Sequence, residues 1–179
     1  FLMRILGIDP GTARTGWGVV DTATGRDFRA VDYGCIVTSK ELTLSARLVE
    51  IHSAVSSIME KYRPDVVAVE QVFFAKNAKS AIDVGHARGV SLLAAATMNV
   101  PLEEVTPLQV KSMVVGYGNA TKEQVGKMVT SLLGLAKVPR PDDVCDALGV
   151  AVTAASKRSF HARLAASRAD ETPRREKTR

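Results

Sequence analysis

MRILGIDPGT, residues 3–12, decides the fold of this chain, because an apolar run ends there in an acid, Asp9, and the turn signal Pro10-Gly11 follows at once. A carboxylate at the end of a buried strand is costly unless it is paired or binds a metal. A second apolar run, Val66-Val67-Ala68-Val69, ends in the same way, in Glu70. We therefore expect both carboxylates at one edge of a sheet, sharing a metal ion.

The hydrophobic pattern predicts an α/β domain with a mixed five-stranded sheet flanked by helices. Strands are expected at residues 3–9, 16–21, 28–37, 65–70 and 101–105. Helices are expected at residues 44–62, 78–98, 107–115 and 121–133, and over about 15 residues after Pro141. Short links predict an antiparallel meander for the first three strands. A helical crossover predicts that the first and fourth strands are parallel, so that both carboxylates lie at the carboxyl edge, where ligands bind.

A third acidic group opens the last expected helix. Asp143 and Asp146 are three residues apart and share a helix face, whereas Asp142 follows Pro141 and fits a helix cap. Asp142 and Asp146 also share a face at a spacing of four, and the helix dipole alone favours acids at this end. Taken with Asp9 and Glu70, we favour a site for a pair of divalent cations, which would make a phosphodiester-cleaving centre.

The charge is uneven along the chain. Residues 1–156 hold 16 basic and 16 acidic side chains, whereas residues 157–179 hold eight Lys or Arg and three Asp or Glu. We therefore expect one domain over residues 3–156, and a basic, disordered tail over 157–179 that is either a solvated arm or an aid to DNA binding. The two cysteines form neither a disulfide framework nor a metal-binding spacing, which favours a reducing, cytoplasmic setting, and no apolar stretch is long enough to span a membrane.

Several motifs in order resemble the RuvC family of bacterial Holliday-junction resolvases. The motifs are Asp9-Pro10-Gly11-Thr12 with Thr15-Gly16-Trp17-Gly18, Glu70-Gln71-Val72-Phe73, Ala75-Lys76-Asn77-Ala78, Val114-Val115-Gly116-Tyr117-Gly118 with Lys122, and Asp143-Val144-Cys145-Asp146-Ala147-Leu148. Each motif alone is weak, but the ordered set is specific. The resemblance covers roughly residues 3–156.

The resemblance implies a ribonuclease-H-like fold and a homodimeric, structure-specific endonuclease that resolves four-way DNA junctions in recombination and repair. It implies that Asp9, Glu70, Asp143 and Asp146 are the catalytic, metal-binding tetrad, holding two Mg²⁺ per subunit, with Mn²⁺ as a substitute. Some family members carry His at the position of Asp143. Paired nicks would leave 5′-phosphate and 3′-hydroxyl ends, and the family works beside a branch-migration motor.

The resemblance also implies DNA contacts outside the tetrad. These are Phe73, Lys76, Asn77, Lys111 and Lys122. Phe73 is expected to be the exposed member of the pair Phe73-Phe74 and to stack on an unpaired base. Taken alone, Lys111 and Lys122 are each more typical of a solvated helix face, and Thr121 can cap a helix beside Lys122.

A row of small residues, Ala81, Gly85 and Gly89, recurs every four residues in the second expected helix. Two glycines inside a helix cost about 2 kcal/mol relative to alanine, so close approach of another backbone is the expected reason. The row can pack on the protein's own sheet, or it can form a two-fold dimer contact, as the family resemblance implies.

Three rival functions are open at this stage. The segment from Asp9 to Gly16 also resembles the first phosphate loop of actin-like and sugar-kinase ATPases, but no second Asp-x-Gly-Thr occurs in the chain. Short resolvase-like RNA-processing nucleases share the first motif but lack the run that follows Glu70. An inactive junction-binding scaffold is disfavoured because all four carboxylates are present.

Overall fold

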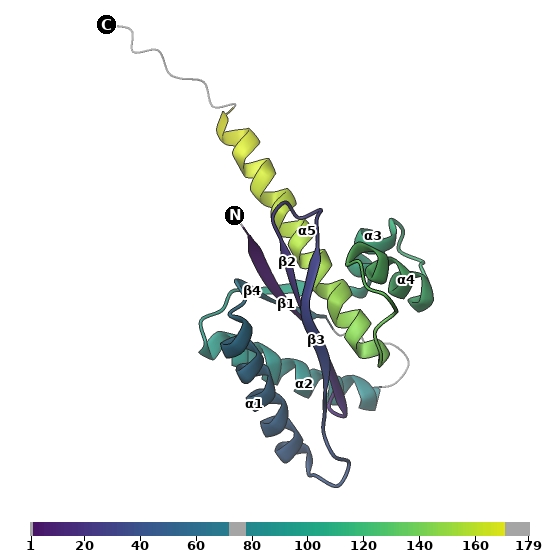
Figure 1. The fold of residues 1–179 in the computed structure, drawn as a ribbon. Coiled ribbons are helices and arrows are strands. Elements are labelled where there is room, and N and C mark those ends of the chain that lie inside the picture. Colours follow the sequence, from purple (N-terminus) through teal and green to yellow (C-terminus); the bar gives the residue numbers. More distant parts are fainter. Residues whose placement is uncertain (1, 72–77, 171–179) are drawn as a thin grey trace, which may run out of the picture.

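A five-stranded mixed sheet lies between two layers of helices in the computed structural model, which describes residues 2–71 and 78–170 (Figure 1). The strands are β1 (Met3–Asp9), β2 (Arg14–Thr22), β3 (Arg29–Val37), β4 (Val66–Glu70) and β5 (Leu102–Val105). Their order across the sheet is β3-β2-β1-β4-β5. The first three strands are antiparallel, and β1, β4 and β5 are parallel. The predicted meander and crossover are confirmed.

In the described part of the chain, five helices cover the sheet. They are α1 (Leu44–Tyr62), α2 (Ala78–Thr97), α3 (Pro107–Val115), α4 (Lys122–Leu132) and α5 (Asp142–Asp170). Side chains alternate along β1, so that Ile5 points to one face and Leu6 and Ile8 to the other, all at most 1% exposed. Leu6 and Ile8 belong to a core with α1 and α2, and Ile5 belongs to a core with α3, α4 and α5.

Glycines allow α5 to lie directly on β1 and β2. A Cβ atom on Gly7 would stand 2.1 Å from the carbonyl oxygen of Ala147, and one on Gly18 would stand 2.5 Å from the side chain of Leu148. These distances are far below a normal van der Waals contact, so larger residues would push the helix away. The seam brings the first turns of α5 to the edge of the sheet where β1 ends.

The two short helices begin with reciprocal caps. Thr106 and Gln109 form a capping box at α3, and Thr121 and Gln124 form one at α4. In each, the threonine hydroxyl accepts a backbone N–H and the glutamine side chain accepts the N–H of the threonine. The prediction of Thr121 as a cap is confirmed, and the cap fixes the direction in which Lys122 leaves the helix.

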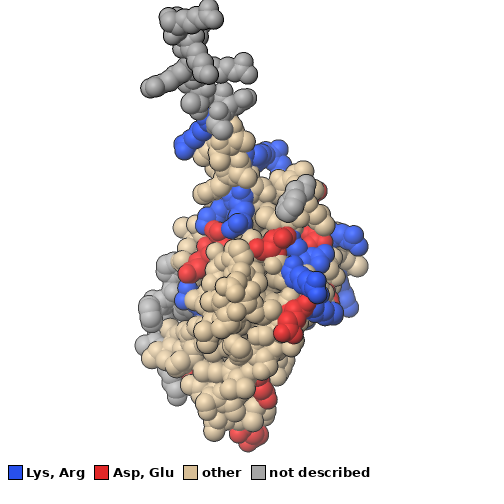
Figure 2. Space-filling view, turned by 90° about the vertical axis from the view of Figure 1, so that its left-hand side faces the viewer, with Lys and Arg blue, Asp and Glu red and all other residues tan. Residues whose placement is uncertain are grey.

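The last helix is longer than the sequence suggested. We expected about 15 residues after Pro141 and disorder from residue 157, but α5 has 29 residues and continues to Asp170. Residues 157–168 contain no Gly or Pro but three Ala, three Arg and one Leu, so helix propensity favours the extension, although residues 160–168 are exposed. The extension protrudes from the body of the molecule (Figure 1) and carries Lys and Arg side chains (Figure 2). Within the described residues, no helix is both long and apolar enough to cross a membrane.

Candidate active site

The ends of β1 and β4 bring Asp9 and Glu70 together. Ile8 pairs with Val69 in the parallel register, so the next residue on each strand is one of the two acids. Side chains two residues apart on a strand lie on the same face of a sheet. Gly7 and Ala68 lie on the face that α5 covers, so Asp9 and Glu70 belong to that face as well. The predicted meeting of the two strand carboxylates is therefore seen in the register.

Burial and mutual repulsion make these two acids weak. The pKa of Asp9 is raised from 3.8 to about 8, chiefly by burial and then by the charges of Glu70, Asp146 and Asp143. The pKa of Glu70 is raised from 4.5 to about 7 by burial and by Asp146, although Lys122 and a hydrogen bond with Asp9 oppose the shift. Such a cluster favours protons, or other cations, that neutralise it.

Asp146 enters the same cluster from the first turns of α5. Its Oδ2 atom accepts a hydrogen bond of 2.6 Å from Lys122 Nζ at the start of α4. A cavity of about 290 Å³ opens between the strand ends and these helices. It is lined by Asp9, Glu70, Pro107, Val110, Lys111, Lys122, Val125 and Asp146. Three of the four predicted tetrad residues thus face one cavity, together with two of the three predicted lysines, Lys111 and Lys122.

The fourth acid, Asp143, lies on the other side of the cluster, against β2. Arg14 Nε stands 3.1 Å from Asp143 Oδ2, but the contact lacks hydrogen-bond geometry and is an ion pair only. Among the described residues, Oδ2 has no hydrogen-bond partner although the atom is buried. A buried carboxylate oxygen without a hydrogen-bond donor costs free energy of desolvation. A bound cation or a donor at this atom would remove that cost.

The donor set fits a hard divalent cation. It consists of carboxylate oxygens, which Mg²⁺ prefers, and it includes the buried, unpartnered oxygen of Asp143. As placed, however, no three His, Cys, Asp or Glu side chains within residues 2–71 and 78–170 converge closely enough to hold a metal. Asp146 pairs with Lys122, and Asp143 pairs with Arg14. These ion pairs keep the two carboxylates turned toward the basic side chains.

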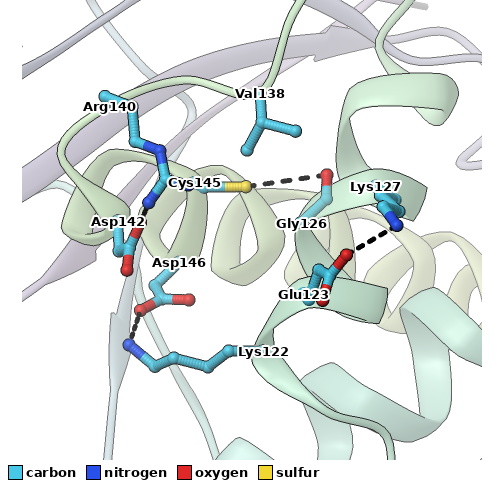
Figure 3. A pocket seen from close by; sticks show the side chains of 9 residues that line it. All are labelled: Lys122, Glu123, Gly126, Lys127, Val138, Arg140, Asp142, Cys145 and Asp146. Atoms are coloured by element: carbon cyan, nitrogen blue, oxygen red, sulfur yellow. Dashed lines mark hydrogen bonds and ion pairs between the residues drawn. The ribbon is translucent and has the colours of Figure 1, made fainter.

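A second cavity, of about 480 Å³, lies behind the Lys122–Asp146 pair (Figure 3). Its rim carries the ion pairs Glu123–Lys127 and Arg140–Asp142. Asp142 is the first residue of α5 and pairs with Arg140, so the sequence-based idea of Asp142 as a cap is not supported. The thiol of Cys145 also lines this cavity, and burial raises its pKa to about 11.

Three of the predicted DNA contacts, Phe73, Lys76 and Asn77, lie outside the described residues. One functional candidate was missed by sequence reasoning, namely Arg14. The register of the β1–β2 hairpin indicates its position. Asp9 on β1 pairs with Gly16 on β2, and Arg14 lies two residues before Gly16, so it is close to the acidic end of β1.

The sheet order, with acids at the ends of β1 and β4 and on the helix that packs across them, defines a ribonuclease-H-like domain. The family model described as "Crossover junction endodeoxyribonuclease RuvC" matches residues 5–154. The chain belongs to the RuvC family. This membership decides against the ATPase rival and the short RNA-processing nucleases.

Individual relatives agree with this assignment. The RuvC of Caldicellulosiruptor saccharolyticus is 52% identical over 150 residues, which cover 84% of this chain and 90% of the relative. The RuvC of Brevibacillus brevis is 52% identical over 158 residues, covering 88% and 95%. Among solved structures, Thermus thermophilus RuvC in complex with a Holliday junction substrate is similar with a TM-score of 0.84 and 37% identity, covering 89% of this chain and 96% of that one.

Proposed function

We propose that this chain is a structure-specific endonuclease that resolves four-way DNA junctions by paired nicks. The observation that carries the proposal is the cavity where Asp9, Glu70 and Asp146 meet Lys111 and Lys122 in a member of the RuvC family. The relatives named above are crossover junction endodeoxyribonucleases, and one of them was solved with a Holliday junction substrate.

We propose that Asp9, Glu70, Asp143 and Asp146 hold two Mg²⁺ ions per subunit, with Mn²⁺ as a substitute. Bound there, divalent cations would supply Lewis-acid activation of water and neutralise charge on the phosphate that is cut. To act as ligands, Asp9 and Glu70 would give up their protons to solvent, and Asp146 would leave its hydrogen bond with Lys122. Cleavage of the bond to the 3′ oxygen leaves 5′-phosphate and 3′-hydroxyl ends.

Lys111 and Lys122 are proposed to bind the phosphate backbone beside the tetrad. The Lys122 side chain is 72% exposed, so its ion pair with Asp146 contributes little free energy, and Lys122 can exchange Asp146 for a phosphate. From the sequence alone, Phe73 is proposed to stack on a base freed at the crossover, with Lys76 and Asn77 beside it. A branch-migration motor is proposed as a partner on family grounds, and no surface is assigned to it.

A homodimer is proposed on the exposed face of α2. Cβ atoms on Gly85 and Gly89 would meet nothing within 4 Å in the part of the chain that the structure describes, so packing among those residues does not require glycine there. Ile82 and Leu93, each 55% exposed, lie on the same face as the glycines. A second copy of the helix would cover this apolar stripe, and two-fold symmetry would set two active sites on two strands of one junction.

Cleavage assays test the proposal with three substrates: a mobile four-way junction, a plain duplex and an RNA. Only the junction should be cut efficiently, and EDTA should stop the reaction until Mg²⁺ or Mn²⁺ is added. Asp146→Asn should lower the cleavage rate by at least about a hundredfold while junction binding persists, because a lost ligand removes several kcal/mol of transition-state stabilisation.

Asp142→Asn is the matched control. It changes the same residue type on the same helix, at a carboxylate that pairs with Arg140 instead of facing the strand acids. It should cleave nearly normally. Loss of binding in step with cleavage in the Asp146 variant, or equal loss in both variants, would reject the metal assignment.

A further inference from the structure

We infer that Arg14 is a positioning residue: it orients Asp143 through Nε and binds a phosphate of the DNA strand with its terminal nitrogens. The inference rests on the proposed junction cleavage. Arg14 is the first residue of β2, and its Nε lies 3.1 Å from the Asp143 oxygen that has no hydrogen-bond donor among the described residues.

The backbone around Arg14 is held in place. Thr15 donates a hydrogen bond of 2.8 Å to the carbonyl of Gly11, and Thr38 donates one of 2.6 Å to the carbonyl of Thr12. Thr38 also donates its N–H to the carbonyl of Ala13 at 3.2 Å. The turn between β1 and β2 is therefore tied both to itself and to the end of β3. Arg14 leaves this turn at a defined point, five residues after Asp9.

The distance to Asp143 is set by the close approach of β2 and α5. A Cβ atom on Gly16 would stand 1.9 Å from the carbonyl oxygen of Asp143. No other residue type fits there without a shift of the helix, so the strand carrying Arg14 is in direct contact with the backbone of the acid. The Arg14–Asp143 pair is thus a consequence of core packing and not of a chance meeting of two surface side chains.

The guanidinium has donors to spare. Arginine carries five N–H donors in a planar fork, and Nε is the atom that lies 3.1 Å from Asp143. The Arg14 side chain is 57% exposed, and its two Nη groups donate no hydrogen bond within residues 2–71 and 78–170. A phosphate held by the tetrad would lie within reach of those groups, and bidentate phosphate binding is the geometry that arginine favours.

The arrangement places one cation on each side of the acidic cluster. Lys122 contacts Asp146 on the side of the cavity, and Arg14 contacts Asp143 on the side of β2. A DNA strand crossing the cluster would therefore meet a positive side chain on both flanks. Binding of its phosphate would at the same time fix the rotamer of Asp143, which links substrate binding to the alignment of a tetrad carboxylate.

The test compares Arg14→Gln and Arg14→Lys with the wild type and with Arg26→Gln. Arg26 lies in the turn beyond the far end of β2, roughly 26 Å along the strand direction, and its loss changes the net charge equally. Junction affinity is measured in EDTA over a range of salt concentrations. Single-turnover cleavage is measured with Mg²⁺ and saturating protein, so that weaker binding does not limit the rate. Thermal melting controls for folding.

Arg14→Gln should reduce the slope of log affinity against log salt by about one, the effect of a single lost phosphate contact. It should also slow saturated cleavage by about 10- to 100-fold, because a misplaced catalytic group costs that order of rate. Arg14→Lys should keep the salt slope but not the rate, since an ammonium cannot hold carboxylate and phosphate in one plane. Arg26→Gln should match the wild type in rate.

An unchanged salt slope in Arg14→Gln would overturn the phosphate contact. A wild-type rate in Arg14→Gln, or full rescue by lysine, would overturn the positioning role. A wild-type protein that cuts no junction would reject the proposed function itself. If the wild type and Arg26→Gln both cut the junction, the proposed function stands, and the Arg14 variants then test the inference alone.

Discussion

Gly16 and Asp143 are in direct backbone contact across the seam between β2 and α5, with space for no side chain at Gly16. Gly16 is also the register partner of Asp9. Gly16 is therefore in contact with both Asp9 on β1 and Asp143 on α5, and the distance between these two acids depends on its small size.

Gly16→Ala should therefore lower both stability and cleavage. Overpacking of a core contact costs about 1–3 kcal/mol, and the shift of α5 would move Asp143 and Asp146 away from Asp9. Urea unfolding and single-turnover cleavage measure the two effects. Gly126→Ala on α4 is the control, because its Cβ would meet its neighbours at 3.5 Å or more, an ordinary contact. The control should be as stable as the wild type or up to about 1 kcal/mol more stable.

The metal-free protein should lose stability as the pH rises from about 5 to about 8. The pKa values of Asp9 and Glu70 are raised to about 8 and about 7 in the folded state, so the folded chain binds more protons than the unfolded chain in this window. Stability falls with pH wherever that is the case. Asp9→Asn should flatten the dependence, whereas Asp142→Asn should leave it unchanged.

Mg²⁺ should oppose this loss, because it binds the deprotonated carboxylates. The rise in melting temperature on adding Mg²⁺ should be larger at pH 8 than at pH 6, and cleavage should increase over the same range. Urea midpoints measured across this pH range, with and without Mg²⁺, give the comparison. A metal-free stability that rises steadily from pH 5 to pH 8 would contradict the raised pKa values.

Gly89→Leu should weaken self-association about tenfold or more, because a bulky side chain would separate two helices in close contact at a cost of 1–3 kcal/mol. The fold of each subunit should persist, since among the described residues nothing lies within 4 Å of a Cβ atom at Gly89. Light scattering and circular dichroism report the two properties. Ser131→Leu adds the same side chain at an exposed position on α4 and should remain dimeric. A folded, fully dimeric Gly89 variant would move the interface away from α2.

Local patterns in the sequence were sufficient for the fold and for the placement of Asp9 and Glu70 at neighbouring strand ends. Alternating apolar residues and short links decide the order of strands, and the acids at the ends of β1 and β4 follow from that order. The ion pairs of Arg14 and Lys122 depend instead on how closely α5 packs on β2 and on how α4 is capped. Such distances arise from tertiary contacts between glycines and a distant helix, which the pattern of a single segment does not contain.

The length of α5 was predicted wrongly for a related reason. The end of the apolar pattern near residue 156 marks the end of the core, since Ala154 and Ala155 are fully buried, but not the end of the helix. Helix propensity and the ion pairs of Lys157 and Arg158 with Glu103 carry the helix onward. Burial of apolar side chains decides where the core ends, whereas helix propensity and ion pairs decide where the helix ends.

This distinction leads to a prediction for removal of residues 158–179. The core is complete before the cut, and the exposed Arg158–Glu103 contact, at 3.7 Å, contributes about 0–1 kcal/mol. Phe160 is 56% exposed and Arg163 lines only an open groove beside Phe28, so little further stability is lost. Metal-dependent cleavage at low salt should therefore remain within a few fold of the full chain.

Junction affinity should respond differently to the same truncation. The removed segment carries seven Lys or Arg, so any phosphate contacts made by it would be lost, and the salt dependence of binding would become shallower. The triple variant Arg158→Gln, Arg163→Gln, Arg168→Gln keeps the helix and removes part of the charge, which separates charge from length. Gel shifts across a salt series, melting curves and cleavage rates complete the comparison. Unfolding of the truncated chain, or loss of all cleavage at low salt, would make the extension an integral part of the catalytic domain.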